Sequence, residues 1–322
     1  MAWLPERDTY GPERPTMRDV EPLNRIFAEA FTDRYRRDGM SGVRVPHLNP
    51  AVWRYALEDA GEGAMVWRDA DGELCAFNMA HLSGREGWMG PLAVRPDRQG
   101  AGLGKVMLLA GINWLKERGA RTIGLETMPR TIENIGFYSR LGFVPRHLTV
   151  TLVRDLGRRP ALHPEVLSTA GPARPDRLAE CRALAQRLQP GTDFTRELAI
   201  SADLRIGDTL LLRDATGALT GFALFHTVAL AAGRPQDEVR VLKLVAADGD
   251  AFERLVAGLE AAALAADIRR LTFRCQTAYG PAYLRMVHLG YRAHWTDLRM
   301  TLAQHEEVPV PAGAVVWSNW EI

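Results

Sequence analysis

The chain has 322 residues, with 40 Lys and Arg against 39 Asp and Glu and a formal net charge of +1. This balance excludes the basic surface that nucleic-acid binding needs. The length favours two domains, since a domain typically holds about 150 residues. A content of 47% hydrophobic and 25% charged residues is typical of a soluble globular protein.

The cysteines and the apolar runs exclude two further classes of protein. Cys75, Cys181 and Cys275 stand apart, with no Cys-x-x-Cys pair and no histidine cluster at metal spacing, so we expect no metal site. The start of the chain has no apolar signal core, and the longest apolar run, Val106 to Leu115, is too short to cross a bilayer. We therefore expect a cytoplasmic protein without a membrane or nucleic-acid partner.

In chain order, apolar residues at helical spacing predict a helix from Val20 to Tyr35, and a polar loop from Arg36 to Gly42 follows it. The next expected elements are a helix from Pro50 to Ala60, strands at Ala64 to Trp67, Leu74 to His81, Trp88 to Val94 and Ala120 to Met128, and a strand from Phe143 to Val153 that closes the first unit. Pro91 interrupts its strand and indicates an edge or a bulge, because proline lacks the N–H that a ladder uses.

The stretch from Leu92 to Lys105 joins a strand-like start, three glycines and a helix-length apolar segment. A helix N-terminus offers unpaired N–H groups and a positive dipole end, and glycines let an anion approach closely. A phosphate or pyrophosphate is the expected ligand. A P-loop would need glycine at position 99 and Ser or Thr at 106, where Gln99 and Val106 stand, and a dinucleotide fingerprint would need glycine in place of Lys105.

The pattern that does fit is Gln-x-x-Gly-x-Gly, formed by Gln99, Gly102 and Gly104 directly after the strand. A second pattern follows one helix and one strand later, with Asn134, then Tyr138, then a Gly-Phe pair. Together, in this order, the two motifs resemble those of the GCN5-related N-acetyltransferase (GNAT) family, whose glycine loop binds acyl-CoA.

The resemblance implies acetyl-CoA as co-substrate and gives backbone groups most of its contacts. The strand beside the proline bulge would pair with pantetheine as an added strand would, and loop N–H groups would hold the pyrophosphate. The residues expected to bind the cofactor are Leu92, Ala93, Val94, Gln99, Gly100, Ala101, Gly102, Leu103, Gly104, Lys105, Asn134 and Tyr138. Family members fold their early region over the acceptor entrance, so the loop from Arg36 to Gly42 is a candidate for substrate contact.

Three residues are expected to be catalytic: Tyr138, Asn134 and Glu126. By resemblance, Tyr138 is the general acid that protonates the departing thiolate. Asn134 would bond the pantetheine arm or cap its helix.

The general base is the least defined role, because Trp88 stands where many relatives carry a glutamate. Glu126 is the first choice, since burial of a carboxylate at the end of an apolar strand is expected to raise its pKa. Glu86, His81 and water remain open as alternatives. His81 ranks lower because an equivalent histidine recurs later in the chain.

The second half repeats the first. The segment from Arg68 to Phe77 recurs as Arg213 to Phe222, and His81 recurs as His226, at a constant offset of 145 residues. We therefore divide the chain into an acetyl-CoA-binding domain at 1–156, a degenerate copy at 157–305 and a tail at 306–322.

The second copy lacks the residues that carry chemistry. Its loop is short and contains Asp248 and Asp250, which would repel a pyrophosphate. Ala282 matches Asn134, and Met286 matches Tyr138. We expect a scaffold rather than a second catalyst.

The expected fold class is α/β (α+β), with two tandem GNAT folds. Each would have a mixed, mostly antiparallel twisted sheet with a splayed fourth and fifth strand pair, flanked by helices. Trp317 and Trp320 near the end of the tail favour burial, either on the first domain or on a second subunit, which leaves a homodimer open.

The expected function is transfer of an acetyl group from acetyl-CoA to a primary amine, in a small molecule or a peptide, by direct attack in a ternary complex. The alternative is a non-catalytic acyl-CoA-binding sensor or scaffold. Retention of Tyr138 and Asn134 favours the enzyme.

Overall fold

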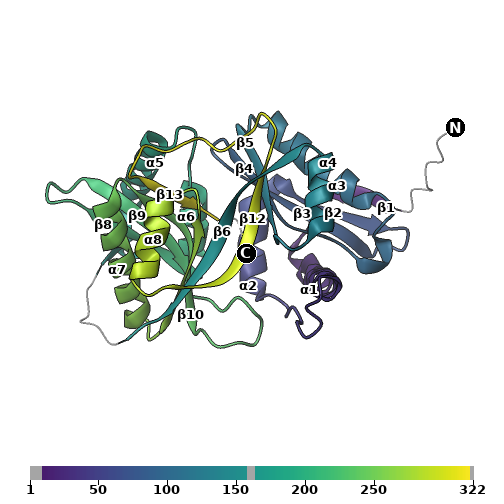
Figure 1. The fold of residues 1–322 in the computed structure, drawn as a ribbon, viewed down its shortest axis with the longest axis horizontal. Helices are drawn as coiled ribbons and strands as arrows, with labels where there is room; N and C mark the ends of the chain where they lie inside the picture. Colours follow the sequence, from purple (N-terminus) through teal and green to yellow (C-terminus); the bar gives the residue numbers. More distant parts are fainter. Residues whose placement is uncertain (1–8, 158–163, 320–322) are drawn as a thin grey trace.

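Figure 1 shows two units side by side, whose strands join in one continuous twisted sheet flanked by helices. This computed structural model describes residues 9–157 and 164–319. The elements of the first half are β1 (Thr9–Glu13), α1 (Val20–Arg37), α2 (Pro50–Ala60), β2 (Ala64–Asp69), β3 (Leu74–Ser83), β4 (Glu86–Val94), α3 (Leu103–Glu117), β5 (Thr122–Thr127), α4 (Ile132–Arg140) and β6 (Phe143–Asp155).

The second half repeats this order. Its elements are β7 (Glu165–Val166), α5 (Arg174–Leu188), α6 (Thr195–Asp203), β8 (Gly207–Arg213), β9 (Leu219–His226), β10 (Glu238–Ala246), α7 (Gly249–Ala265), β11 (Arg270–Gln276), α8 (Gly280–His288), β12 (Arg292–Leu302) and β13 (Val315–Ser318). The mixed, mostly antiparallel sheet with flanking helices confirms the predicted fold class.

Helices cover both faces of the first unit's sheet. On one face α1 and α2 bury Leu23, Ile26 and Trp53 against strands β2 and β3. The start of α2 is fixed locally, because the Asn49 side chain accepts a hydrogen bond from the backbone N–H of Ala51 and proline follows at the first helical position. On the other face α3 and α4 pack over β4 and β5.

The two copies exchange their last long strands. Along the sheet the order is β1-β2-β3-β4-β5-β12-β6-β11-β10-β9-β8-β7, so β12 of the second copy lies between β5 and β6. Leu298 of β12 pairs with Thr127 of β5, while Thr149 of β6 pairs with Gln276 of β11. Figure 1 shows β6 and β12 running together through the middle of the molecule. The expected strand is therefore present as β6, but the prediction that it closes the first unit is wrong.

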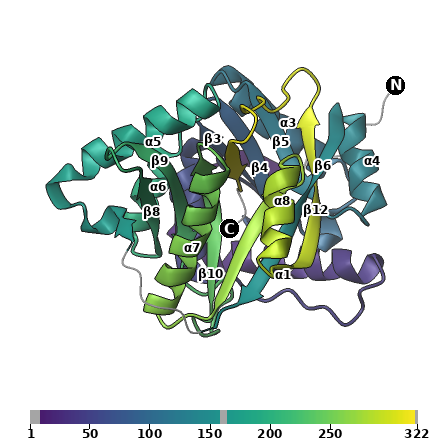
Figure 2. The same cartoon turned by 60° about the vertical axis from the view of Figure 1, so that its left-hand side comes forward.

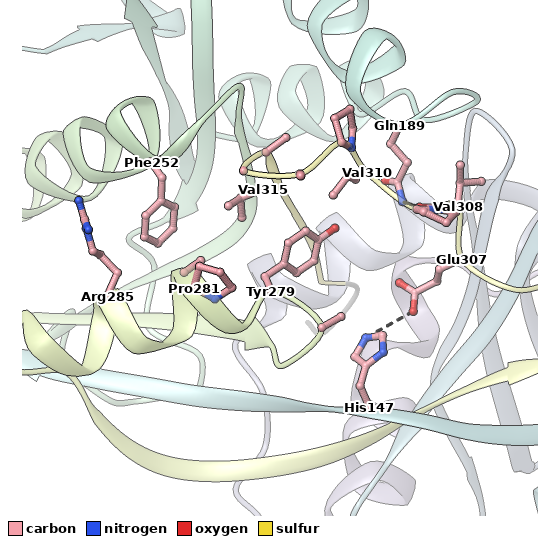
Figure 3. Close-up of a pocket in the computed structure, with 18 of the residues that line it drawn as sticks. His147, Gln189, Phe252, Tyr279, Pro281, Arg285, Glu307, Val308, Val310 and Val315 are labelled. Atoms are coloured by element: carbon pink, nitrogen blue, oxygen red, sulfur yellow. Dashed lines mark hydrogen bonds and ion pairs between the residues drawn. The ribbon is translucent and has the colours of Figure 1, made fainter.

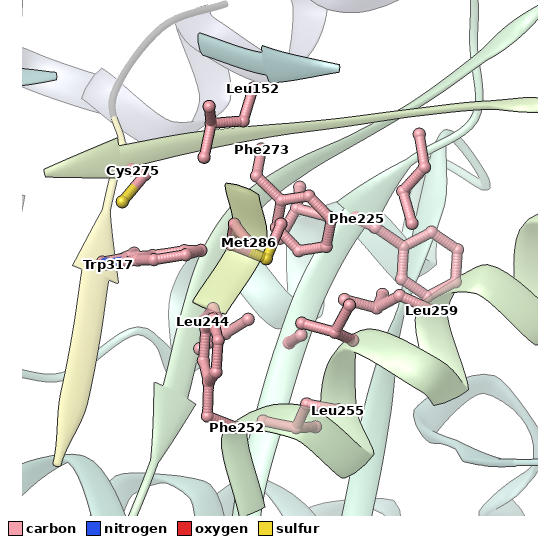
Figure 4. Packing of buried hydrophobic residues seen from close by; sticks show 14 of the residues in the cluster. Leu152, Phe225, Leu244, Phe252, Leu255, Leu259, Phe273, Cys275, Met286 and Trp317 are labelled. Atoms are coloured by element: carbon pink, nitrogen blue, oxygen red, sulfur yellow. The ribbon is translucent and has the colours of Figure 1, made fainter. Parts of the chain in front are cut away.

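The tail docks onto the second copy. Its strand β13 pairs antiparallel with β10, with Trp317 opposite Leu244 and Val316 opposite Val245. Figure 4 shows Trp317 in the second core, where its ring lies edge-on against Phe252 and Phe273. For residues 315–318 the predicted docking onto the first domain or a second subunit is wrong. Trp320 lies outside the described residues.

Candidate functional site

The splay between β4 and β5 leaves one strand edge free. The two strands pair in parallel from Glu86 opposite Thr122 to Met89 opposite Leu125, and then separate. Beyond that point, among the residues that the structure describes, residues 92–94 of β4 have strand partners in β3 alone. Their other edge presents backbone groups to which an extended chain can add, as the sequence predicted for pantetheine.

The glycine loop connects this free edge to α3. Gly100 and Gly102 have φ values of +85° and +86°, a region that L residues with side chains rarely adopt. Gly102 is the residue before the first turn of α3, where the N–H groups of Leu103 and Gly104 precede the helical ladder and those of Lys105 and Val106 donate to the Gly102 carbonyl. Across the loop, the side-chain amide of Gln99 donates to the Val94 carbonyl at 3.0 Å and ties the loop to the strand. The arrangement places a helix N-terminus beside the strand edge, as an anion site requires.

Most of the predicted site residues converge on one cavity of about 250 Å³. Those that line it are Leu92, Ala93, Val94, Gln99, Gly104, Asn134 and Tyr138. Gly100, Ala101, Gly102, Leu103 and Lys105 lie in the adjoining loop and helix start but do not line the cavity. Residues of α1 that the motifs did not indicate, Ala30, Phe31, Asp33 and Arg34, form the opposite wall together with Arg37.

Tyr138 lies in the wall of this cavity, on α4. Its side chain is 6% exposed and its ring packs near Phe137 and Phe143. Burial raises the pKa of its phenol to about 12. The hydroxyl therefore keeps its proton at neutral pH, as a general acid must.

Two contacts join α1 to the start of α4 beside the cavity. Arg34 Nη1 lies 2.7 Å from Glu133 Oε2, and the Thr131 hydroxyl donates to Asp38 Oδ2 at 2.6 Å. Arg34 also pairs with Asp38 at 2.6 Å. Arg34 and Glu133 are 99 residues apart in sequence, and Asp38 and Thr131 are 93 apart. Only the tertiary fold therefore shows that α1 helps to enclose this site.

Glu126 has a different environment from the one expected. Its Oε1 accepts hydrogen bonds from the Thr149 hydroxyl at 2.5 Å and from Arg299 Nη1 at 2.7 Å, and Arg274 Nη2 pairs with Oε2. Burial alone would raise its pKa, but the two arginines outweigh burial and lower the pKa to about 2. The predicted rise of this pKa is wrong. Glu126 as the base stays a prediction, and these contacts argue against it.

The two other candidate bases are also buried. Burial raises the pKa of Glu86, against the opposing charges of Lys243 and Arg299, and Glu86 Oε1 accepts from the Trp88 indole at 3.0 Å. His81 lies between the Asp59 carboxylate, at 2.6 Å, and the Gly90 carbonyl, at 3.0 Å. Both ring nitrogens of His81 are therefore in contact with acceptor atoms.

A second cavity, of about 340 Å³, opens where the acceptor entrance was expected. It is lined by Met40 of the early loop, by Met128, Pro129 and Arg130 after β5, and by residues 293–296 at the start of β12. One wall of this opening thus comes from the second copy.

We call the gap where β4 and β5 separate the slot; in the second copy, the chain itself fills the counterpart of this slot. Strands β10 and β11 pair only from Glu238 to Val241, and β13 then occupies the free edge of β10. At the start of α7, the Asp248 carboxylate accepts from the Ala251 N–H at 2.8 Å and occupies the helix N-terminus. The first slot has a free edge and the second does not.

The largest cavity described, about 670 Å³, lies beside this filled slot. Figure 3 shows tail residues Val308, Val310 and Val315 facing Tyr279 and Pro281 across it. At one end His147 Nε2 lies 3.5 Å from Glu307 Oε2. The cavity lies away from the predicted cofactor residues and contains none of them.

Within residues 9–157 and 164–319, no group of three or more His, Cys, Asp and Glu side chains could hold a metal ion. In the same ranges no helix combines the length and the apolar character that a membrane crossing needs.

Comparisons with known proteins show which family this site resembles. Residues 23–143 match the model of the acetyltransferase (GNAT) family. A mycothiol acetyltransferase from Actinosynnema mirum is 30% identical over 164 residues, which cover 44% of this chain and 50% of that protein. The chain therefore spans about half the length of this curated relative.

Solved structures extend the likeness to the whole fold. A GCN5-related N-acetyltransferase from Sphaerobacter thermophilus superposes with a TM-score of 0.60 at 15% identity, over 96% of this chain and 99% of that one. A tandem GNAT protein from the clavulanic acid biosynthesis pathway gives 0.59 at 15% identity, over 91% and 97%. These two likenesses concern the fold alone.

Proposed function

This chain belongs to the GCN5-related N-acetyltransferase family, and on that premise we propose that its first copy transfers an acetyl group from acetyl-CoA to a primary amine. The observation that carries the proposal is the convergence of a free strand edge, a glycine loop and Tyr138 on one cavity. In the ternary complex the amine nitrogen attacks the thioester carbonyl carbon, and the tetrahedral intermediate then expels the CoA thiolate.

Backbone groups hold the cofactor in this proposal. The free edge of residues 92–94 pairs with the pantetheine amides, and the loop from Gln99 to Lys105 directs N–H groups and the α3 dipole at the pyrophosphate. Asn134 lies in the cavity wall, where its amide is placed to bond the pantetheine arm. Acetyl-CoA is the donor we propose, and no metal takes part.

Tyr138 supplies the proton that the leaving thiolate needs. Its phenol lies in the cavity wall and keeps its proton because burial raises its pKa. Transfer of this proton to sulfur leaves a phenolate, which the ammonium of the tetrahedral intermediate or water reprotonates.

For the base, we propose that the amine loses its proton to water before it attacks. Glu126 is paired with two arginines, and His81 contacts an acceptor through each nitrogen. Glu86 lies at the start of β4, about 13 Å along the strand from Gly90 at roughly 3.3 Å per residue. The kcat/KM for a series of primary amines should rise with pH toward each amine's own pKa. If the pH profiles of kcat/KM for all the amines had their inflection at the same pH, a base on the enzyme would be indicated instead.

The amine acceptor is a small molecule or a peptide that enters beside Met40 and Trp295. The early loop and the start of β12 form opposite sides of this opening, so both copies contact the acceptor. The Trp295 ring packs edge-on against Tyr35 of α1 at 5.9 Å, which fixes this wall.

The experiment that tests the function is thiol release from acetyl-CoA in the presence of a panel of primary amines, with mass analysis of the acetylated product. Amine-dependent release is expected. Binding of acetyl-CoA without release for any amine would favour the alternative, a non-catalytic acyl-CoA sensor or scaffold.

A further inference from the structure

A chain of polar contacts, buried at Asp59 and His81 and partly exposed at Arg196, connects the second copy to the bulge of β4. Arg196 of α6 lies 2.9 Å from Asp59 Oδ1, and His81 Nδ1 lies 2.6 Å from Asp59 Oδ2. On its other side His81 Nε2 lies 3.0 Å from the carbonyl oxygen of Gly90. The side chains of His81 and Asp59 are 3% and 2% exposed, so water does not compete for these contacts.

The partners of His81 define its protonation. A carbonyl oxygen can only accept a hydrogen bond, so Nε2 must carry the proton in its contact with Gly90. An ionised carboxylate can also only accept, so Nδ1 must carry a proton as well. Burial alone would raise the pKa of Asp59, but the bond from His81 and the charge of Arg196 lower it, which keeps it ionised. With both nitrogens protonated, the ring is an imidazolium.

Other charged groups surround this pair. Asp59 lies on α2, Arg196 and Glu197 lie on α6, and Lys243 lies on β10. The charges of Arg196 and Lys243 lower the pKa of Asp59, and the charge of Asp59 raises the pKa of Glu197. Glu197 also accepts a hydrogen bond from the hydroxyl of Ser83, two residues beyond His81 on β3. Burial and the charge of Asp59 raise the pKa of Glu197 to about 7, and burial lowers the pKa of Lys243 to about 8, so Asp59 is the carboxylate that stays ionised beside His81.

The carbonyl that His81 contacts lies at the point where the cofactor slot begins. Opposite β3, Ala80 pairs with Met89 and Asn78 pairs with Leu92, so Gly90 and Pro91 form a bulge against one residue. A bulge interrupts the ladder, and the Gly90 carbonyl then needs a donor from elsewhere. Gly90 has a φ of +149°, which suits glycine.

We propose that His81 is a positioning residue, a charged imidazolium that fixes the bulge carbonyl of Gly90 and so aims the free strand edge of residues 92–94 at the thioester. The second copy contributes Arg196, which orients Asp59 behind His81. This inference rests on the proposed function, in which that edge holds the acyl-pantetheine arm.

The repeated histidine of the second copy provides a contrast. His226 Nε2 contacts the Ser201 hydroxyl at 2.9 Å, and its ring lies edge-on to Tyr55. Burial lowers the pKa of His226 well below its usual range, so this ring is neutral. The same position therefore carries a charge only in the copy that keeps a cofactor slot.

Protonation is tested in the free protein by nitrogen NMR of the histidine rings at about pH 7.5, where an unperturbed imidazole is mostly neutral. Two protonated nitrogens are expected for His81 and one for His226, with His81→Gln and His226→Gln assigning the signals. A neutral His81 ring would overturn the proposal. Because this measurement does not use activity, it is independent of whether the chain acetylates amines.

Positioning is tested by comparing His81→Leu with His81→Gln, whose amide N–H can still reach the Gly90 carbonyl. Removing the donor should lower kcat about tenfold or more, as expected for a misplaced reacting group, and change the Kd for acetyl-CoA less than about threefold. Glutamine should recover part of the loss, and His226→Gln should retain wild-type kcat. Equal kcat losses in both His81 variants, or normal kcat in both, would contradict positioning. If His81→Leu does not fold, a charged ring in the wild type is still required, and a kcat of His81→Gln lowered by the full factor of about ten or more would contradict positioning.

Discussion

Glu126 is held by two arginines that the second copy supplies. Arg299 is 1% exposed and contacts Glu126, Glu307 and the ring of Trp88, so its charge depends on these neighbours. Removing one partner of a buried ion pair leaves an uncompensated charge, which typically costs about 3–5 kcal/mol. We expect Glu126→Gln to lower the free energy of unfolding by about 3 kcal/mol at pH 7, measured by urea denaturation.

The pH dependence of that stability has a defined sign. The pKa of Glu126 is about 2 in the folded chain, below the ordinary value of 4.5. Its contribution is therefore complete above pH 4.5 and is lost as the pH falls toward 2. The stability difference between wild type and Glu126→Gln should shrink over this window. A difference that stays constant down to pH 2 would contradict the ion-pair account.

For Tyr138 we predict a separation of chemistry from binding. Tyr138→Phe keeps the ring that packs against Phe143 and removes only the hydroxyl group. The acetyl-CoA affinity should therefore be unchanged, while kcat falls about a hundredfold. Calorimetry and steady-state kinetics measure the two quantities, and Tyr291→Phe in the second copy is the control. Normal turnover would reduce Tyr138 to a packing residue, whereas equal losses in affinity and kcat would make it a cofactor-binding residue.

Local motifs pointed to seven residues that line the cavity of about 250 Å³, because the loop and the start of α4 each act through residues close in sequence. That these residues bind the cofactor stays a prediction. The environment of Glu126 could not be predicted in this way. Its arginine partners are 148 and 173 residues away in sequence, so no spacing indicates them. The same limit applies to Arg196, which meets Asp59 across 137 residues.

At the scale of elements, β13 distinguishes the two copies. It pairs with residues 243–246 of β10, the counterparts of the free edge in β4, and it buries Trp317 to 1% exposure. The sequence indicated that Trp317 is buried, because exposed tryptophan is unfavourable, but it did not indicate which strand edge receives it.

Trp317→Ala should destabilise the chain by about 3–5 kcal/mol, the usual cost of truncating a buried aromatic residue. Equilibrium unfolding in urea measures this loss. The variant should not gain a second acetyl-CoA site, because Asp248 still caps α7 and the loop before it is short. A second equivalent of bound acetyl-CoA would show that β13 alone blocks the slot.

For the whole molecule, the exchange of β6 and β12 makes the copies interdependent. The repeat at an offset of 145 residues predicted two units, and the ranges 1–156 and 157–305 remain a proposal for them. The sequence did not predict the exchange, because β6 and β12 are equivalent strands and either could pair with β5 by pattern alone. In the structure β12 takes that place, brings Arg299 to Glu126 and lines the cavity of about 340 Å³.

A calorimetric titration of the full chain with acetyl-CoA decides whether the first copy alone binds this cofactor, through its glycine loop. We predict one equivalent per chain. Gly102→Val should abolish binding, because Gly102 has a φ of +86° and its side chain would occupy the phosphate site, whereas Gly217→Val, at a φ of +87° in the second copy, should bind normally. Circular dichroism checks that both variants fold. Two equivalents in the wild type, or unchanged affinity in Gly102→Val, would contradict the claim.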